Sequence, residues 1–278
     1  MSLFKNDADR LVEAISDGAS LIMPCDTNGV PMATVRALIR KGARGLTLIG
    51  GPTSGLAADL LIGAGCVAQI ESAAVNLGEY GGAPRFHVAA GKPGLAVRET
   101  TCPAIHAALQ AAEKGIPFIP LRGLIGSDVQ RLRKDWKLID NPYAPESMRD
   151  PIALLPAITP DVALIHAACA DDEGNVWIGL RREVLTMAHA ARITLATVEK
   201  RVSGSLLDDP ATASGTISSL YIDHVAACPS GAWPVGFANQ YGPDGDHMRA
   251  YAKQAKTTAG FTAYLDDHVL NEQAVAAE

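Results

Sequence analysis

The sequence predicts an open α/β fold, with a mostly parallel β-sheet covered by helices on both faces. Short apolar runs, typical of buried strands, alternate with amphipathic segments along nearly the whole chain. Glycines such as Gly42 and Gly115 stand where predicted helices end. The chain has 278 residues, of which 48% are hydrophobic, so it can bury a large core. Strands that alternate with helices favour a parallel sheet between two helical layers.

Each expected element follows from its local pattern. Helices are predicted where apolar residues recur at helical spacing, at 7–16, 31–41, 56–63, 101–114, about 182–191 and, as a polar terminal helix, about 246–270. Strands are predicted from short apolar runs at 21–23, 46–49, 66–70, 117–121, 162–166, 176–178, 193–198 and 221–226. The segment 130–156 is rich in proline and charge, and we expect an excursion without regular structure. One domain is expected over 1–278, with a C-terminal extension from about 229.

Composition excludes several classes of protein. The net charge of −6 gives no electrostatic reason to bind nucleic acid or an anionic membrane. No apolar run approaches the roughly 20 residues that span a bilayer. The N-terminal residues carry charges where a signal peptide needs an apolar stretch, so we expect a cytoplasmic protein. The five cysteines are odd in number and never spaced CxxC, which indicates reduced thiols.

The most informative segment is 46–67, where a buried strand runs into a glycine-rich turn that opens a helix. Such a turn lies at the carboxyl end of its strand, where open α/β proteins bind ligands. Gly50, Gly51 and Ser54 are therefore candidates to bind an anion or a developing oxyanion. The turn fits neither GxGxxG nor a P-loop, and close packing of a simple turn is an equal alternative. The segment contains no obvious nucleophile, and no GxSxG motif is present.

A second glycine cluster and one strand end add further candidates. The cluster contains Gly78, Glu79, Gly81, Gly82 and Arg85. Glu79 beside Arg85 has the composition of a catalytic acid and its partner, but also of a structural ion pair.

His166 ends a predicted strand, which fits a ligand contact and a hydrogen-bonded core histidine equally well. The carboxylates of 171–175 miss the EF-hand spacing and favour a hairpin turn. The other histidines show no metal-ligand spacing, so no metal is expected. Cys102, before a predicted helix, has the context of a capping or core thiol more than of an activated one.

Together these residues resemble the alpha (A-type) subunit of family I CoA-transferases, of the glutaconate CoA-transferase type. The resemblance covers nearly the whole chain. It is carried by Asp17–Pro31, Leu46–Val67 with its DLLIGAGCV tract, Gly115–Pro120, Ile139–Pro142, and Asp161–Ala167 with Gly174-Asn175.

The resemblance implies a heteromer with a beta subunit, in the form of a heterodimer or α2β2. In the family, the nucleophile is a glutamate in a Ser-Glu-Asn-Gly motif of that beta subunit, and this chain has no such motif. No catalytic residue is therefore expected here, and coenzyme A is expected as a substrate rather than a permanent cofactor. The chain would supply donors and an acyl pocket from Gly50, Gly51, Ser54 and Gly78–Gly82. Asn76, Arg85 and Arg122 are candidates to hold the acid substrate.

One loop departs from the family pattern. Pro24, Cys25 and Asp26 stand where the family has Gly-Gly-Phe, so a backbone donor is lost and a side chain is added. This loop must contact the ligand differently. Two alternatives therefore stay open: one subunit of an acyl-CoA hydrolase that opens a ring carbon–carbon bond, and a non-catalytic acyl-CoA-binding protein. A sugar-phosphate isomerase is a weaker one, because fold alone does not give function.

Overall fold

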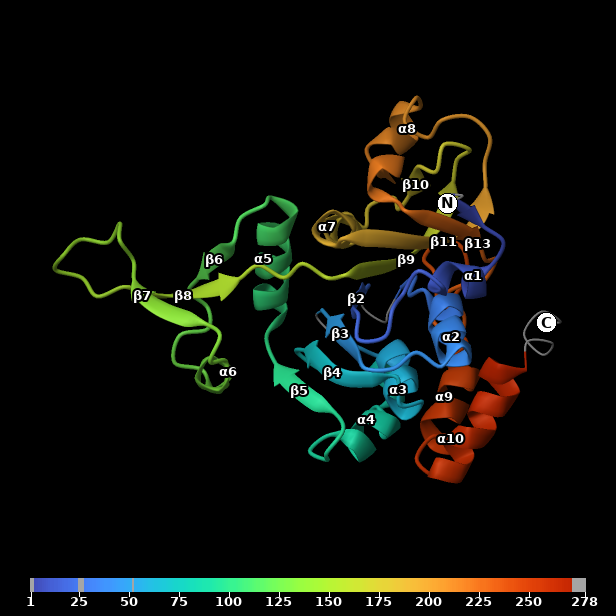
Figure 1. Ribbon diagram of the computed structural model, residues 1–278, viewed down its shortest axis with the longest axis horizontal. Coiled ribbons are helices and arrows are strands. Elements are labelled where there is room, and N and C mark those ends of the chain that lie inside the picture. Colours follow the sequence, from blue (N-terminus) through green and yellow to red (C-terminus); the bar gives the residue numbers. More distant parts are fainter. Residues whose placement is uncertain (1–2, 25–27, 52, 272–278) are drawn as a thin grey trace.

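A central parallel sheet organises the molecule (Figure 1). The computed structural model describes residues 3–24, 28–51 and 53–271. Strands of the sheet follow the spatial order β1-β13-β11-β9-β2-β3-β4-β5, and neighbours along this path are parallel. Their bounds are β1 (Phe4–Lys5), β2 (Ser20–Met23), β3 (Leu46–Gly50), β4 (Val67–Ser72), β5 (Ala96–Glu99), β9 (Val162–Ala170), β11 (Ile193–Arg201) and β13 (His224–Ala227). Two short strands, β10 (Val176–Trp177) and β12 (Thr216–Ile217), extend it antiparallel beside β9.

The order of the strands reverses between β2 and β9. From β2 the chain builds outward through β3, β4 and β5, and it then returns to the other side of β2 to build β9 and β11. Ligands of open α/β proteins bind outside the carboxyl ends of strands at such a switch point. The fold therefore directs attention to the loops that follow β2, β3, β4 and β9.

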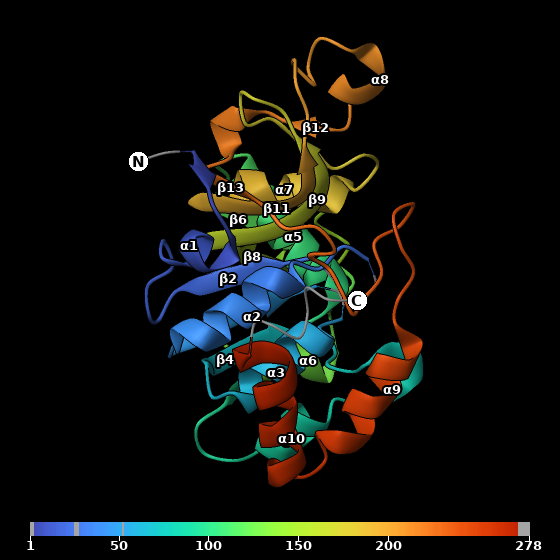
Figure 2. The same ribbon diagram turned by 90° about the vertical axis from the view of Figure 1, so that its right-hand side faces the viewer.

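Helices cover both faces of this sheet, as predicted (Figures 1 and 2). Successive side chains of β2 enter different clusters: Leu21 lies in the largest core cluster, and Ile22 lies with Ile105 and Met187 on the opposite face. The first face carries α1 (Ala8–Val12), α2 (Met32–Lys41), α3 (Leu56–Gly63) and α4 (Pro84–Ala89), and the second carries α5 (Cys102–Glu113) and α7 (Arg182–Ala190). Each buried Leu or Ile contributes about 1.5–3 kcal/mol to this sandwich.

A second helical layer lies outside α2 and α3. The predicted terminal helix is in fact three pieces, α9 (Gly245–Gln254), α10 (Thr258–Leu265) and the π-helical η3 (Asp266–Leu270). The break occurs where Thr257 caps α10 by accepting a hydrogen bond from Gly260 N at 3.0 Å. A polar cap inside a periodic pattern thus ends one helix and starts another.

The expectation that 130–156 has no regular structure is wrong. This region contains α6 (Asp128–Leu132), β7 (Lys137–Asp140) and β8 (Pro151–Pro156), and β8 pairs antiparallel with both β7 and β6 (Phe118–Leu121). The resulting arm projects from the main body on the left of Figure 1. Both prolines of β8 are at its ends, where a strand tolerates them. Every residue of β7 is exposed. The strand therefore needs no apolar face, and its sequence lacks the alternation of apolar and polar residues by which a half-buried strand is predicted.

Smaller differences occur at other elements. No sequence pattern indicated β5 or the bounds of α4, and the strand expected at 221–226 begins only at His224 because η2 (Ser219–Tyr221) precedes it. The short α8 (Pro210–Ala213) and the turn η1 (Gly78–Tyr80) complete the described elements.

The predicted hairpin turn at 171–175 is confirmed. Asn175 O accepts from Asp171 N at 3.0 Å, and β9 and β10 pair on either side of the turn. The carboxylate of Asp171 accepts from the backbone N–H groups of Leu206, Asn175 and Glu173. Although burial opposes it, this hydrogen bonding lowers the pKa of Asp171. Among the described residues, no group of three His, Cys, Asp or Glu side chains is placed to hold a metal ion.

Candidate functional site

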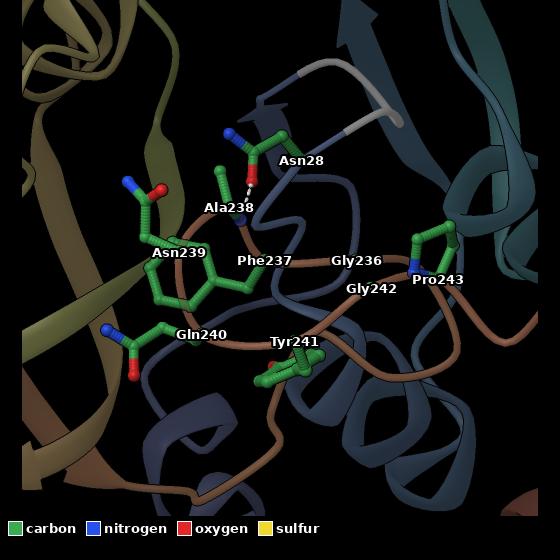
Figure 3. A pocket seen from close by; sticks show the side chains of 9 residues that line it. All are labelled: Asn28, Gly236, Phe237, Ala238, Asn239, Gln240, Tyr241, Gly242 and Pro243. Carbon is green, nitrogen blue, oxygen red and sulfur yellow. Dashed lines mark hydrogen bonds between the residues drawn. The ribbon is translucent and has the colours of Figure 1, made fainter.

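Three adjoining cavities lie along the carboxyl edge of the sheet. The first is a narrow crevice between the ends of β2 and β3, with Pro24, Gly50 and Ser54 in its walls. The second, of about 360 Å³, is bounded by the loop after β4 and by α9. The third, of about 540 Å³, is formed by Asn28 and the segment 236–243 (Figure 3). Thr53 is shared by the first two cavities, and Gly236 and Pro243 are shared by the last two.

The glycine-rich loop after β3 forms the crevice. Gly50 is buried, and a Cβ built on it would collide with Ser54 Oγ, so only glycine fits there. Ser72 Oγ donates to Ala74 O at 2.8 Å, and therefore Ser54 Oγ, 3.1 Å away, must donate to Ser72 Oγ. The hydroxyl proton of Ser54 is thus already used within the protein. Its backbone is fixed as well, because Ser54 N donates to Ala74 O at 2.8 Å.

The loop after β4 lines the second cavity. Asn76 Oδ1 accepts from Gly78 N at 2.9 Å and orients a tight turn in which Gly78 has φ 61°. This leaves the Asn76 Nδ2 group as a donor for a ligand. Glu79 and Tyr80 follow in η1, and the Tyr80 hydroxyl donates to the Glu79 carboxylate, which raises the pKa of Tyr80.

A small hairpin in the segment after β13 forms the third cavity (Figure 3). Phe237 and Tyr241 exchange backbone hydrogen bonds of 2.9 and 3.0 Å. Asn28, which follows β2, accepts from Ala238 N at 2.6 Å through its side-chain oxygen, so the hairpin is fixed to the switch-point loop. Asn239 takes the left-handed conformation at its tip, with φ 67°.

A buried network holds this hairpin to the sheet. His166 is 0% exposed in β9, and its Nε2–H donates to Glu199 Oε1 at 2.7 Å. The same oxygen accepts from the Tyr241 hydroxyl at 2.8 Å, and Glu199 Oε2 accepts from Ser230 N at 2.7 Å. Nδ1 of His166 lies 2.9 Å from Thr197 Oγ1.

Protonation states in this network follow from burial and hydrogen bonding. Burial lowers the pKa of His166 despite the neighbouring carboxylate, so the imidazole is neutral. Burial alone would raise the pKa of Glu199, but the hydrogen bonds from His166, Ser230 N and Tyr241 outweigh it and lower that pKa. His166 is thus a hydrogen-bonded core histidine that supports the site from beneath, rather than a side chain that faces the cavity.

Several candidates from the sequence lie elsewhere. Arg85 stacks on Phe261 at 4.9 Å, donates to Ala255 O at 3.3 Å and faces the C-terminal helices, not Glu79. Gly82 fits closely against the ring of His87, and Gly81 ends η1 with φ 102°. Gly51 is buried near Ile105, and Arg122 forms a bidentate pair with Asp150 on the arm. Cys25 and Asp26 lie outside the described residues.

Other cavity residues have no counterpart among the predicted ones. They include Asn28, Thr53, Leu77, Met248 and residues of the segment 235–243. The glycines and prolines of this segment predict a loop. No local pattern in the sequence indicates that this loop crosses to the far end of the sheet. The features define an α/β protein with a candidate ligand site at the switch point, built from loops that are distant in sequence.

Comparisons with known proteins identify the family. The coenzyme A transferase family model matches residues 5–227. The A-type subunit of a 3-oxoadipate CoA-transferase from Pseudomonas knackmussii is 30% identical over an alignment of 268 positions, which covers 92% of this chain and 89% of that protein. The crystal structure of glutaconate coenzyme A-transferase from Acidaminococcus fermentans superposes with a TM-score of 0.88 at 27% identity, covering 97% of this chain and 89% of that one. The chain belongs to the coenzyme A transferase family, which confirms the resemblance and the predicted fold.

Further relatives show how varied similar chains are. An uncharacterized protein from Archaeoglobus fulgidus is 33% identical over an alignment of 245 positions that covers 86% of this chain, but the chain spans only 53% of that protein's length. The IpdA component of a cholesterol ring-cleaving hydrolase from Rhodococcus jostii is 31% identical over 84% of this chain and 81% of its own. The decarboxylase AibA/AibB superposes with a TM-score of 0.82 at 30% identity, covering 96% of this chain and all of that one. No helix among the described residues is long and apolar enough to cross a membrane.

Proposed function

We propose that this chain is the alpha subunit of a heteromeric acyl-CoA:carboxylate CoA-transferase that functions in the cytoplasm. One observation carries the proposal: the chain superposes over 97% of its length on glutaconate coenzyme A-transferase, and its cavities lie at the switch-point edge where that fold binds ligands. The partner is a beta-type subunit that carries a glutamate nucleophile. Coenzyme A takes part as a substrate and not as a resident cofactor.

The proposed reaction proceeds in two half-reactions. The partner's carboxylate attacks the acyl-CoA thioester carbonyl, the C–S bond breaks, and an acyl-glutamyl anhydride and CoA thiolate form. The thiolate then attacks the glutamyl carbonyl and releases the first acid, which leaves a glutamyl-CoA thioester. An incoming acid reverses both steps and departs as the new acyl-CoA. A carboxylate is a weak nucleophile, so orientation and exclusion of water are essential.

In this chain, the side chain best placed to stabilise the oxyanion is Asn76. Its Oδ1 is held by Gly78 N, so Nδ2 is presented to the second cavity in a fixed orientation. The loss of one such donor costs about 10²–10³ in rate. Ser54 serves instead to fix the loop through Ser72, since its proton is already donated.

The test is reconstitution with a beta-type subunit that carries the glutamate motif. We expect transfer of CoA from acetyl-CoA to a free acid, and mass spectrometry of the partner chain should reveal bound CoA when no acceptor is present. Asn76→Ala should lower kcat/KM by about 10²-fold, whereas Asn6→Ala, at an exposed position that lines none of the three cavities, should not. Product that forms from acyl-CoA and water alone, with no acceptor, would overturn the transferase assignment.

A hydrolase of the ring-opening type is the second candidate. Its support is the similarity to the cholesterol ring-cleaving hydrolase component, together with Pro24, which replaces a glycine of the CoA-transferase signature in the crevice. Incorporation of ¹⁸O from labelled water into the product distinguishes the two reactions, because a transferase leaves the oxygen of water out of its products.

A further inference from the structure

The second cavity differs chemically from its neighbours. It is more enclosed than the third, with a volume of about 360 Å³, and its walls are mainly hydrocarbon. Leu77, Val235 and Met248 line it, and each of these residues is at most 4% exposed. They come from the loop after β4, from the segment after β13 and from α9, so three separate parts of the chain converge on one apolar surface.

We propose that this cavity binds the acyl tail of the substrate and that Glu79 makes it select an uncharged tail over one that ends in a carboxylate. The inference rests on the proposed function and names its substrate class: acyl-CoA whose tail is a short hydrocarbon or another uncharged group. Glu79 is then a specificity-determining residue and not the nucleophile.

The apolar walls provide the attraction. A methylene group that leaves water for such a surface improves binding by about fourfold. Met248 adds an unbranched, polarizable side chain that adapts to tails of different shape. A carboxylate at the end of the acyl tail would lose its hydration in this cavity without a cation to compensate for the loss.

Charges on the rim provide the discrimination. Of the described residues that line the cavity, Glu79 is the single charged one. One cation, Arg249, does lie nearby. Its guanidinium and the Tyr80 hydroxyl both flank Gly245, at 3.3 and 3.4 Å from the position that a Cβ would take there. Arg249 is already paired with Asp246 at 2.7 Å and its side chain is 65% exposed. The rim therefore presents more negative than positive charge to an acyl tail, which repels a carboxylate and accepts a neutral group.

The experiment compares two thioesters of equal length. The acyl tail of valeryl-CoA ends in a methyl group, and that of glutaryl-CoA ends in a carboxylate. Binding to the complex of this chain with its beta-type partner is measured by calorimetry, and transfer to acetate is measured separately. We expect the wild-type complex to prefer valeryl-CoA by tenfold or more. Glu79→Gln should lower the ratio of valeryl-CoA affinity to glutaryl-CoA affinity by about tenfold, because glutaryl-CoA binds more tightly. Glu79→Lys should lower this ratio further.

Glu13→Gln is the matched control. Glu13 is likewise an exposed glutamate, but it follows α1 directly and lines none of the three cavities. Its variant should keep the wild-type ratio. Since Glu79 is exposed, neither substitution at that position should change the melting temperature.

The outcomes separate the two proposals. Equal or tighter binding of glutaryl-CoA by the wild-type complex would overturn the inference, as would a ratio that does not respond to Glu79→Gln. Absence of transfer to any acid, with the valeryl-CoA preference intact, would overturn the proposed transferase reaction and leave the assignment of the tail site standing.

Discussion

At the scale of single residues, Glu199 joins the sheet to the hairpin of the candidate ligand site. Its two carboxylate oxygens accept hydrogen bonds from β9 through His166, from the hairpin through Tyr241 and from the backbone at Ser230. A buried polar network is stabilising only when each member is satisfied, and here the carboxylate is. The hairpin that forms the third cavity therefore depends on a charge located beneath it.

This network predicts a loss of stability on acidification. Because the pKa of His166 is lowered in the fold from its ordinary 6.5, protonation favours the unfolded chain. The contribution of the neutral imidazole is complete above pH 6.5 and decreases as the pH falls below that value. The lowered pKa of Glu199 adds a loss in the same direction below its ordinary 4.5. Urea unfolding between about pH 7.5 and 5 should reveal the decrease.

Two variants separate titration from packing. His166→Asn removes the titrating group, so the free energy of unfolding should become less dependent on pH between about 6.5 and 5. Thr197→Val removes the hydroxyl beside Nδ1 but keeps the imidazole, so stability should fall by about 1 kcal/mol at neutral pH while the decrease on acidification remains. An identical pH dependence in wild type and His166→Asn would refute this assignment.

Gly50 gives the second prediction at this scale. Alanine there would place a Cβ against Ser54 Oγ and displace the Ser54–Ser72 pair, so we expect a loss of about 1–3 kcal/mol in the free energy of unfolding. Gly123→Ala is the control, since a Cβ at that glycine meets nothing within 4 Å. Equal stability of the two variants in urea would show that the crevice adapts.

At the scale of elements, the arm is joined to the main sheet by a buried ion pair. Arg133, which follows α6, is 7% exposed and donates to Glu71 Oε1 of β4 at 2.8 Å. It also donates to both oxygens of Asp135 and stacks on Trp136 at 4.4 Å. One guanidinium thus connects the end of α6 with a central-sheet strand.

Arg133→Met should destabilise the protein strongly. Among the described residues it leaves Glu71, 5% exposed, with just the longer contact to Arg98 at 3.5 Å, and breaking a buried pair in this way costs about 3–5 kcal/mol. Arg131→Met is the comparison, because its pair with Asp128 is exposed and should contribute less than about 1 kcal/mol. Chemical unfolding of both variants measures the difference, and similar values would contradict a supporting role for Arg133.

At the scale of the whole molecule, the C-terminal helices complete both the core and the candidate site. Tyr251 of α9 donates to the buried Asp59 of α3 at 2.6 Å, and Phe261 of α10 fits against Gly63. Met248, one turn before Tyr251, lines the second cavity. The helix that closes the core is therefore also a wall of the proposed acyl site.

Tyr251→Phe tests this closure. It leaves one oxygen of a fully buried carboxylate without its donor, and a hydrogen bond to a charged group contributes about 1.5–3 kcal/mol. We expect a loss of that size and weaker acyl-CoA binding by the complex, while Tyr143→Phe, on a side chain 94% exposed in the arm, should match the wild type. If Tyr251→Phe kept both the melting temperature and the acyl-CoA affinity of the wild type, the role of Tyr251 in closing the core and the site would be refuted.

The limits of prediction are visible at particular residues. Leu21, Leu48 and Leu164 lie in the core because runs of apolar residues form buried strands whatever their partners are. By contrast, Arg85 and Glu79 are close in sequence yet face different parts of the molecule. Local patterns do not say which distant segment meets a side chain, so the hairpin at 237–241 could not be placed from the sequence.

The sequence by itself determined the class of fold and the order of most strands and helices, because burial periodicity and turn chemistry are local properties, and its motifs carried the family resemblance. Only the tertiary structure decided that the ordering reverses between β2 and β9, that the proline-rich excursion is a sheet, and that Asn28, Glu79 and Met248 border adjoining cavities. Those outcomes depend on contacts between segments as far apart as Asn28 and Ala238, whose energies arise only when the chain has closed.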